Sequence, residues 1–299
     1  MVKKIVKKLA IKIDVDTDRG TKQGCPPLAQ ALIQRDIPAT WLWSLGNDNT
    51  GRAIIRIFRP GFFQKVSRTS IVQVYGLRTL MNGTILPAPH IGKRNGDLMR
   101  SLDIDLFEHG IHCWDHVYWQ DFLHGWDLKK TKNQLQLAQN MFVEIFGRPA
   151  KTAGTPGWQA NANSLQAYDE LGFDYGSDTR VGLPFQPKVG EITFRTPQIP
   201  TNLPTLDELI GRDEFPIEKL IDHYLSCMVE GLNVLTIHAE LEGMMYLEWF
   251  TDFLDACTNN GIEFVKLEDE VKTLKNLPVK QMIQAEIDGR SGTLAVPQS

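Results

Sequence analysis

Two carboxylates and two histidines stand at spacings suited to holding a divalent metal. Asp14 and Asp16 lie two apart in the run IKIDVDTD, and side chains two apart on a strand point to the same side. His112 and His116 lie four apart in HCWDH, so on a helix both imidazoles would share one face. One carboxylate and two histidines leave open positions on a metal, as in catalytic sites. The other carboxylate would then be available to transfer a proton.

Each half of this pattern also has an ordinary structural explanation. Aspartates after a strand are commonly turn or cap residues, and a lone HxxxH pair is commonly two partly buried histidines. HCWDH lacks the glutamate of HExxH, so it is not typical of a zinc protease helix. A third histidine, His238, ends the apolar run NVLTIH, where barrel enzymes place catalytic groups. A hydrogen-bonded core histidine is the structural alternative there.

Strands and helices alternate along most of the chain, as in an α/β barrel, and 299 residues fit one such domain. We expect a single domain over residues 1–275, an inserted segment at about 50–95 and a C-terminal tail at 276–299, where periodicity is weak. HCWDH is expected on a helix, after another helix at 96–109. The other expected strands are 9–15, 38–45, 233–238 and 262–267, and the other expected helices are 26–35, 127–146, 164–171, 217–230 and 245–259.

Composition excludes several classes of protein. The four cysteines have no paired spacing, which argues against a disulfide framework or a cysteine zinc site and favours a reducing compartment. Lys8 and Lys12 interrupt the N-terminal apolar run, so it does not read as a signal peptide. No apolar run reaches the length of a transmembrane helix, and no feature indicates nucleic-acid binding.

A long basic segment lies inside this acidic chain. Between Asp48 and Asp97 there are eight basic and no acidic residues, although the chain carries a net charge of −4. Such a segment is a candidate surface for phosphate or lipid headgroups, or a basic surface that pairs with acids elsewhere in the fold. Its first part is amphipathic, which suits either a membrane surface or a helix whose apolar side packs in the core. If it docks on an anionic membrane, the residues expected to do so are Arg52, Arg56, Arg59, Phe62, Phe63 and Arg68.

The order of these motifs resembles the polysaccharide deacetylase family, carbohydrate esterase family 4. The resemblance implies a distorted (β/α)7–8 barrel. It also implies Asp14 as general base, Asp16, His112 and His116 as ligands of Zn2+ (or Co2+, Mn2+ or Ni2+), and His238 as general acid. The family's third motif, RxPxG, aligns on AGTPG, so its arginine is replaced by Ala153. Pro156 has no N–H, which leaves the metal, Gly157 or Trp158 to stabilise the oxyanion.

Long blocks such as NLPTLDELIGRD and TIHAELEG resemble one branch of that family, which removes a formyl group from an amino sugar carried on a polyprenyl phosphate for lipid A modification. The resemblance implies a cytoplasmic protein, peripheral on the inner face of the bacterial inner membrane. The YGSDTR loop suggests Tyr175, Asp178 and Arg180 as sugar contacts. Alternatives are a deacetylase of N-acetylated sugars, a non-catalytic carbohydrate-binding homologue and, more remotely, a two-histidine, one-carboxylate iron oxygenase. The oligomeric state stays open.

Overall fold

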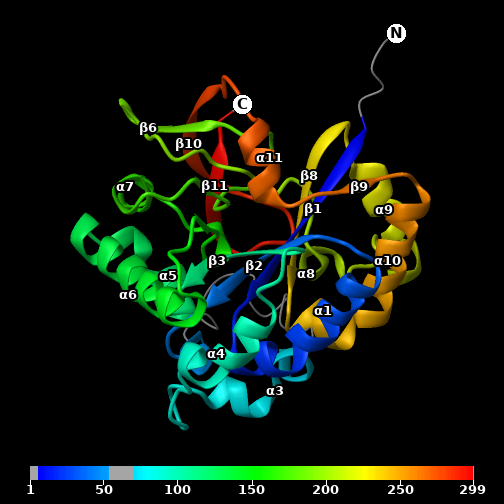
Figure 1. Ribbon diagram of the computed structural model, residues 1–299, viewed down its shortest axis with the longest axis horizontal. Helices are drawn as coiled ribbons and strands as arrows, with labels where there is room; N and C mark the ends of the chain where they lie inside the picture. The colour runs from blue at the N-terminus through cyan, green and yellow to red at the C-terminus, as the bar shows by residue number, and fades with distance from the viewer. Residues whose placement is uncertain (1–5, 54–70, 299) are drawn as a thin grey trace.

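A seven-stranded parallel sheet forms the centre of the protein. The structure, a computed structural model, describes residues 6–53 and 71–298. The strands follow the order β5-β4-β3-β2-β1-β8, and β9 pairs with the start of β1. Helices surround the curved sheet, which confirms the predicted α/β fold of the distorted barrel type (Figure 1). The strands are β1 (Lys7–Val15), β2 (Ala39–Ser44), β3 (Phe107–Cys113), β4 (Thr152–Ala153), β5 (Tyr175–Gly176), β8 (Gly231–His238) and β9 (Glu263–Phe264).

The helices begin and end where the sequence supplies caps. Asp127 accepts a hydrogen bond from the backbone N–H of Lys130 and begins α6, which Gly147 ends in the left-handed conformation. Asn161 and Ser164 form a capping box at the start of α7. The helices are α1 (Cys25–Gln34), α3 (Ile71–Met81), α4 (Ile91–Ser101), α5 (His116–Phe122), α6 (Leu128–Phe146), α7 (Ala162–Leu171), α8 (Leu206–Leu209), α9 (Leu220–Cys227), α10 (Leu247–Asn259) and α11 (Leu267–Thr273).

The middle strands are buried on both faces. Every residue of β2 is buried, and its Trp41 and Trp43 stack with ring centroids 5.6 Å apart. Apolar residues of α1, α6 and α10 complete the same core. A parallel strand covered on both sides is expected to be a near-continuous apolar run, as ATWLWS is. This rigid sheet fixes the positions of the polar residues at its edge.

The HCWDH segment differs from the expected helix. The helix predicted at 96–109 is confirmed for residues 96–101 and wrong beyond them, since α4 ends at Ser101 and β3 begins at Phe107. His112 therefore lies on a strand, and His116 is the first residue of α5, with Asp115 as its N-cap. Periodicity misled here because EHGIHC is buried at every position and so has no alternation to mark a strand.

The C-terminal residues form strands, so the expected tail is wrong. A second sheet has the order β11-β10-β6-β7, made of β6 (Gln186–Val189), β7 (Ile192–Thr193), β10 (Val279–Glu286) and β11 (Thr293–Pro297). Leu294, Ala295 and Val296 are buried, and two of them pack on Trp158. The pairing of β10 with β6 joins residues about a hundred positions apart, which local sequence patterns do not reveal.

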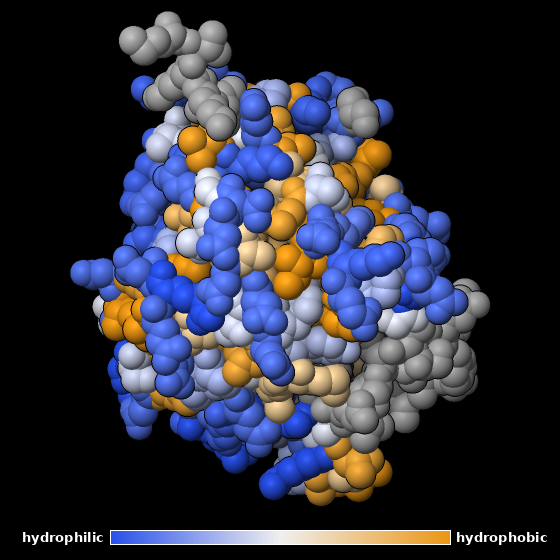
Figure 2. Space-filling view, turned by 90° about the vertical axis from the view of Figure 1, so that its right-hand side faces the viewer, coloured by the Kyte–Doolittle hydropathy of each residue, from blue (hydrophilic) through white to orange (hydrophobic). Residues whose placement is uncertain are grey.

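The surface is mainly polar on the side that carries α9 and α10, where apolar side chains form only small groups (Figure 2). Within residues 6–53 and 71–298, every helix is too short or too polar to cross a bilayer. In the segment predicted as an insertion, the described residues include α3 and the first part of α4.

A buried carboxyl group between the strands gives a test of the fold through pH. Glu108 accepts hydrogen bonds of 2.7 Å from the hydroxyl groups of both Thr40 and Tyr175. Burial raises the pKa of Glu108 from 4.5 to about 7. The folded protein therefore binds this proton more tightly than the unfolded chain does, and stability is lost as pH rises from about 4.5 to about 7.

We expect Glu108→Gln to remove this part of the pH dependence. Relative to the variant, the wild type should lose up to about 3 kcal/mol of unfolding free energy between pH 4.5 and pH 7.5. Thermal unfolding at half-unit pH steps measures the difference. If the unfolding free energies of the wild type and Glu108→Gln change with pH in the same way, Glu108 is not the source of this pH dependence.

Candidate active site

The polar residues that the sequence singled out meet at the carboxyl edge of the main sheet. Asp14 is paired in register with His238 of the neighbouring strand β8, and Asp16 follows the end of β1. His112 lies near the end of β3, and His116 follows three residues after that strand. Carboxyl ends of parallel strands lie on one side of a sheet, so five residues distant in sequence share one site.

Asp16, His112 and His116 form a cluster suited to a metal ion. One ligand atom from each of the three lies within 4.8 Å of the others. Nε2 of His112 is 3.2 Å from one carboxylate oxygen of Asp16, and Nε2 of His116 is 3.5 Å from the other. Nδ1 of His112 donates to the carbonyl oxygen of Gly154 at 2.6 Å. That bond fixes the tautomer in which Nε2 carries the lone pair for a ligand.

The surroundings of the Asp14 and Asp16 carboxylates favour a bound cation. Asp14 and Asp16 are 4% and 8% exposed, and within the described residues one oxygen of each is buried without a hydrogen bond. Burial alone would raise the pKa of Asp16, but the imidazoles of His116, His112 and His238 together lower it far below its usual range. Buried, incompletely paired carboxylates are costly unless a positive charge joins them. The donor set of one carboxylate and two imidazoles therefore fits a divalent transition metal.

Lys12 is a site residue that the sequence analysis did not assign. Its side chain is 1% exposed, and its ammonium lies 4.0 Å from Asp14 Oδ1 and donates to the carbonyl oxygen of Ser177 at 3.0 Å. Burial lowers the pKa of Lys12. A lysine in the middle of a buried strand was the available signal. The ammonium places a cation beside Asp14 in a chain whose third motif has Ala153 in place of arginine.

We expect Lys12→Met to lower the rate constant for hydrolysis by about 100-fold, because Asp14 would lose its neighbouring cation and its orientation. Metal content should not change, since Lys12 contacts none of the three clustered residues at ion-pair distance. Lys8→Met is the matched control on the same strand, because Lys8 pairs with Glu270 at 2.7 Å. If Lys12→Met is as active as Lys8→Met, Asp14 does not depend on the Lys12 ammonium for its role in hydrolysis.

Two buried glutamates hold the loops that carry the site, and neither was predicted. Glu240 Oε1 accepts from the backbone N–H of Asp16 at 3.1 Å and from that of Thr17 at 2.8 Å. Glu242 accepts from the backbone N–H of His238 at 2.8 Å. Burial raises the pKa of each to about 8. At Gly20 a Cβ would stand 1.9 Å from the Glu240 carboxylate, so the close approach requires glycine.

The loop after β4 supplies few free donors. The backbone N–H of Trp158 donates to the carbonyl oxygen of Thr155 at 3.2 Å. The sequence predicted that the backbone N–H of Gly157 or of Trp158 stabilises the oxyanion. Because the N–H of Trp158 is used in this bond, Gly157, with a φ of 62°, is the remaining candidate. The Trp158 ring is 3% exposed, and the guanidinium groups of Arg180 and Arg290 lie 4.7 and 4.6 Å from its centroid. Trp158 is therefore a packing residue in this structure.

The three sugar contacts suggested by the YGSDTR loop are buried in the protein. The Tyr175 hydroxyl donates to Glu108, and Arg180 pairs with Glu208. Asp178 is fully buried and accepts from the backbone N–H of Thr155 at 2.7 Å. Their bonding capacity is used internally, so we leave these three out of the proposed site.

The predicted membrane-docking residues fall mostly outside the described part of the chain. Arg56, Arg59, Phe62, Phe63 and Arg68 belong to residues 54–70, which the structure does not describe. Arg52 is exposed, and its Nε donates to the carbonyl oxygen of Gly83 at 3.0 Å. Membrane docking by this segment stays a prediction.

Comparison with known proteins identifies close relatives. The chain is 34% identical over 298 residues to a Shewanella sediminis protein named a probable 4-deoxy-4-formamido-L-arabinose-phosphoundecaprenol deformylase, ArnD, covering 97% of this chain and 94% of the relative. A Wigglesworthia glossinidia brevipalpis protein of the same name is 34% identical over 287 residues, covering 93% and 98%. No protein-family model matches the chain.

The fold also matches a solved structure. A Mycobacterium smegmatis protein assigned as a polysaccharide deacetylase superposes with a TM-score of 0.62 at 16% identity, covering 96% of this chain and 98% of that one. At this identity the match shows the fold alone. Together with the two relatives, it confirms the family that the motifs predicted. The chain belongs to the 4-deoxy-4-formamido-L-arabinose-phosphoundecaprenol deformylase family, which has the polysaccharide deacetylase fold.

Proposed function

We propose that this chain hydrolyses the formamide of 4-deoxy-4-formamido-L-arabinose linked to undecaprenyl phosphate, releasing formate and the 4-amino sugar lipid. The cluster of Asp16, His112 and His116, with Asp14 and His238 at the same sheet edge, carries the proposal. The relatives named for this reaction align over nearly the whole chain, which favours it over deacetylation of an N-acetylated polysaccharide. The presence of all five residues argues against a non-catalytic homologue.

Asp16, His112 and His116 would hold a divalent metal, with zinc as our first choice and cobalt, manganese or nickel as alternatives. When bound, such an ion supplies Lewis-acid polarisation of the formyl oxygen and a lowered pKa for water. The hydrogen bond from His112 to Gly154 and the bonds from Glu240 to the Asp16 loop hold these side chains in place.

Asp14 and His238 would carry the two proton transfers. Asp14 accepts a proton from the attacking water, with Lys12 beside its carboxylate. The C–N bond of the tetrahedral intermediate can break only when the nitrogen receives a proton, because an amide anion is a very poor leaving group. His238, at the end of the strand paired with Asp14, donates that proton. The N–H of Gly157 is the remaining backbone candidate for binding the oxyanion.

The proposed substrate would bring the protein to a membrane surface. An undecaprenyl chain is confined to the bilayer, so the sugar must be reached from the interface. We propose a peripheral association on the inner face of the bacterial inner membrane, with the product used in lipid A modification. The basic composition of residues 49–96 supports binding to anionic lipid.

The test is formate release from the 4-formamido sugar carried on a polyprenyl phosphate, followed with formate dehydrogenase. We expect release by the metal-loaded protein, loss after dialysis against a chelator, and recovery when zinc is restored. The 4-acetamido analogue is the competing substrate. Faster release of acetate than of formate would replace the proposal with a deacetylase.

A further inference from the structure

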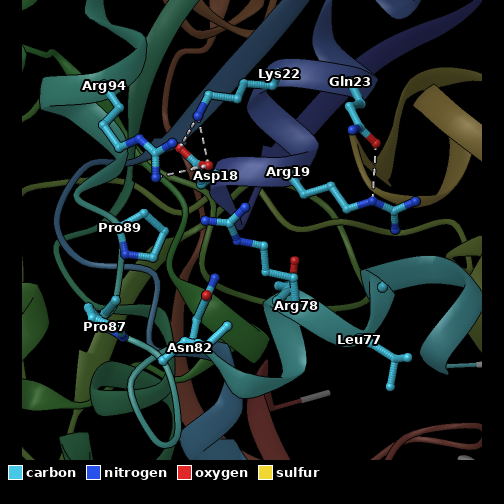
Figure 3. A pocket seen from close by; sticks show the side chains of 14 residues that line it. Asp18, Arg19, Lys22, Gln23, Leu77, Arg78, Asn82, Pro87, Pro89 and Arg94 are labelled. Carbon is cyan, nitrogen blue, oxygen red and sulfur yellow. Dashed lines mark hydrogen bonds and ion pairs between the residues drawn. The ribbon is translucent and has the colours of Figure 1, made fainter.

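A pocket of about 630 Å³ lies beside the candidate active site and outside the groups assigned so far. It is formed between the turn that follows β1 and the segment running from α3 to α4 (Figure 3). Among the described residues, the charged ones that line it are Arg19, Lys22, Arg78, Arg94 and Asp18. These five residues comprise four cations and one carboxylate, a net charge of +3.

The carboxylate of Asp18 already has partners. Asp18 lies 2.8 Å from the Lys22 ammonium and 3.6 Å from the Arg94 guanidinium, and it also accepts from the Asn95 amide at 3.0 Å. In Figure 3 the side chain of Arg78 extends from α3 toward Asp18, on the side opposite Lys22. Converging guanidinium groups form short, strong hydrogen bonds with phosphate oxygens, often two at a time. The charge of the pocket therefore fits a phosphate.

Apolar residues also line the pocket, together with the polar side chains of Gln23, Thr79 and Asn82. Leu86, Pro87, Ala88 and Pro89 form a continuous run along the pocket, and Leu77 is 67% exposed at its other side. An inorganic phosphate gains nothing from such a wall. A phosphate that carries a hydrocarbon chain buries part of that chain there, at about 25 cal/mol per Å² of apolar surface.

The pocket lies within reach of the reacting group. Asp18 is separated from Asp16 only by Thr17, so the Cα atoms of the two aspartates are at most about 7.6 Å apart. The backbone N–H of Asp18 donates to Asp48 at 3.2 Å, and the same carboxylate oxygen accepts from Asn82 at 3.1 Å. These bonds connect the wall of the pocket to the loop after β2.

We propose that this pocket binds the phosphate of the polyprenyl carrier, through Arg78 and Arg94, and the first apolar units of its chain. The inference rests on the proposed function, because it supplies the subsite that would present the sugar to Asp14 and His238. The cations would recognise the phosphate, and the proline-rich wall would recognise the lipid.

The first test compares two soluble substrates that carry the same 4-formamido sugar, one as a geranyl phosphodiester and one as a neutral methyl glycoside. We expect Arg78→Gln and Arg94→Gln each to lower kcat/KM for the phosphodiester by about 10-fold to 100-fold, mainly through KM. Hydrolysis of the methyl glycoside should stay within about twofold of the wild type, as expected when the site of reaction is intact.

Lys93→Gln is the matched control, because Lys93 is an exposed neighbour of Arg94 on α4 and does not line the pocket. A general effect of surface charge would reduce the activity of Lys93→Gln and Arg94→Gln equally, which would overturn the proposal. Unchanged kcat/KM for both arginine variants would also overturn it.

Binding of geranyl phosphate, which contains no formamide, separates this subsite from the reaction. Titration calorimetry should show saturable binding to the wild type, weakened at least about 10-fold by the double substitution of Arg78 and Arg94 with glutamine. Inorganic phosphate that binds as tightly as geranyl phosphate would overturn the lipid assignment. No binding of geranyl phosphate would overturn the subsite, whereas binding without any formate release would refute the proposed function and leave the pocket in place.

Discussion

Replacing Asp16 with asparagine is expected to remove both the bound metal and formate release. Asp16 supplies the only carboxylate of the clustered triad in the described chain, and it lies between the two imidazoles, 3.2 and 3.5 Å from their Nε2 atoms. Loss of a residue that merely supports a ligand costs 10-fold to 100-fold in metal affinity, so loss of the ligand itself should cost about 100-fold or more. Metal content after dialysis, measured by mass spectrometry, and formate release at saturating substrate check both effects.

Asp105→Asn is the control for this substitution. Asp105 is exposed and lies two residues before β3, at the opposite end of that strand from His112. It should keep the metal and the activity of the wild type. Stoichiometric metal in Asp16→Asn at the affinity of the wild type would refute the assignment of this cluster.

Replacing Asp14 with asparagine is expected to leave the metal in place and to stop most of the turnover. Asp14 lies beside the cluster, 3.8 Å from His112 Nδ1, but is not a member of it. Asparagine keeps the shape of the side chain and cannot take a proton from water. Loss of a general base costs about 100-fold to 10,000-fold in rate. Single-turnover formate release, with metal content measured on the same samples, provides the test.

The Asp14→Asn experiment also distinguishes the roles of Asp14 and Asp16, because residue spacing alone does not show which of the two carboxylates binds the metal. Metal loss in Asp14→Asn would make Asp14 a ligand and leave Asp16 as the candidate base. Full activity of Asp14→Asn would show that the Asp14 carboxylate takes no part in the reaction.

The site could be predicted from the sequence because its residues end strands of a parallel sheet. Asp14, Asp16 and His238 follow apolar runs, and the carboxyl ends of such strands lie together. The pairing of His112 and His116 was predicted for the wrong reason. A strand end followed by a helix start brings the two imidazoles within 5.3 Å, measured between ring centroids, as a single helix would also have done.

Other residues were beyond prediction because their partners are distant in sequence. Lys12 reads as an interruption of an apolar strand until the fold places Ser177 and Asp14 around its ammonium. Glu240 reads as a residue after a strand, although it binds the backbone of a loop more than two hundred positions earlier. The C-terminal strands depend on β6 in the same way.

The position of β1 between β2 and β8 has a consequence for biosynthesis. Ile11 pairs with Leu235, 224 positions later, so β1 cannot acquire its β8 neighbour until most of the chain has been made. At about 5–20 residues per second the ribosome takes roughly 10 to 45 s to cover that distance. During this interval the apolar edge of β1 stays open to wrong partners. Efficient production of the active protein is therefore expected to depend on chaperones that bind the nascent chain.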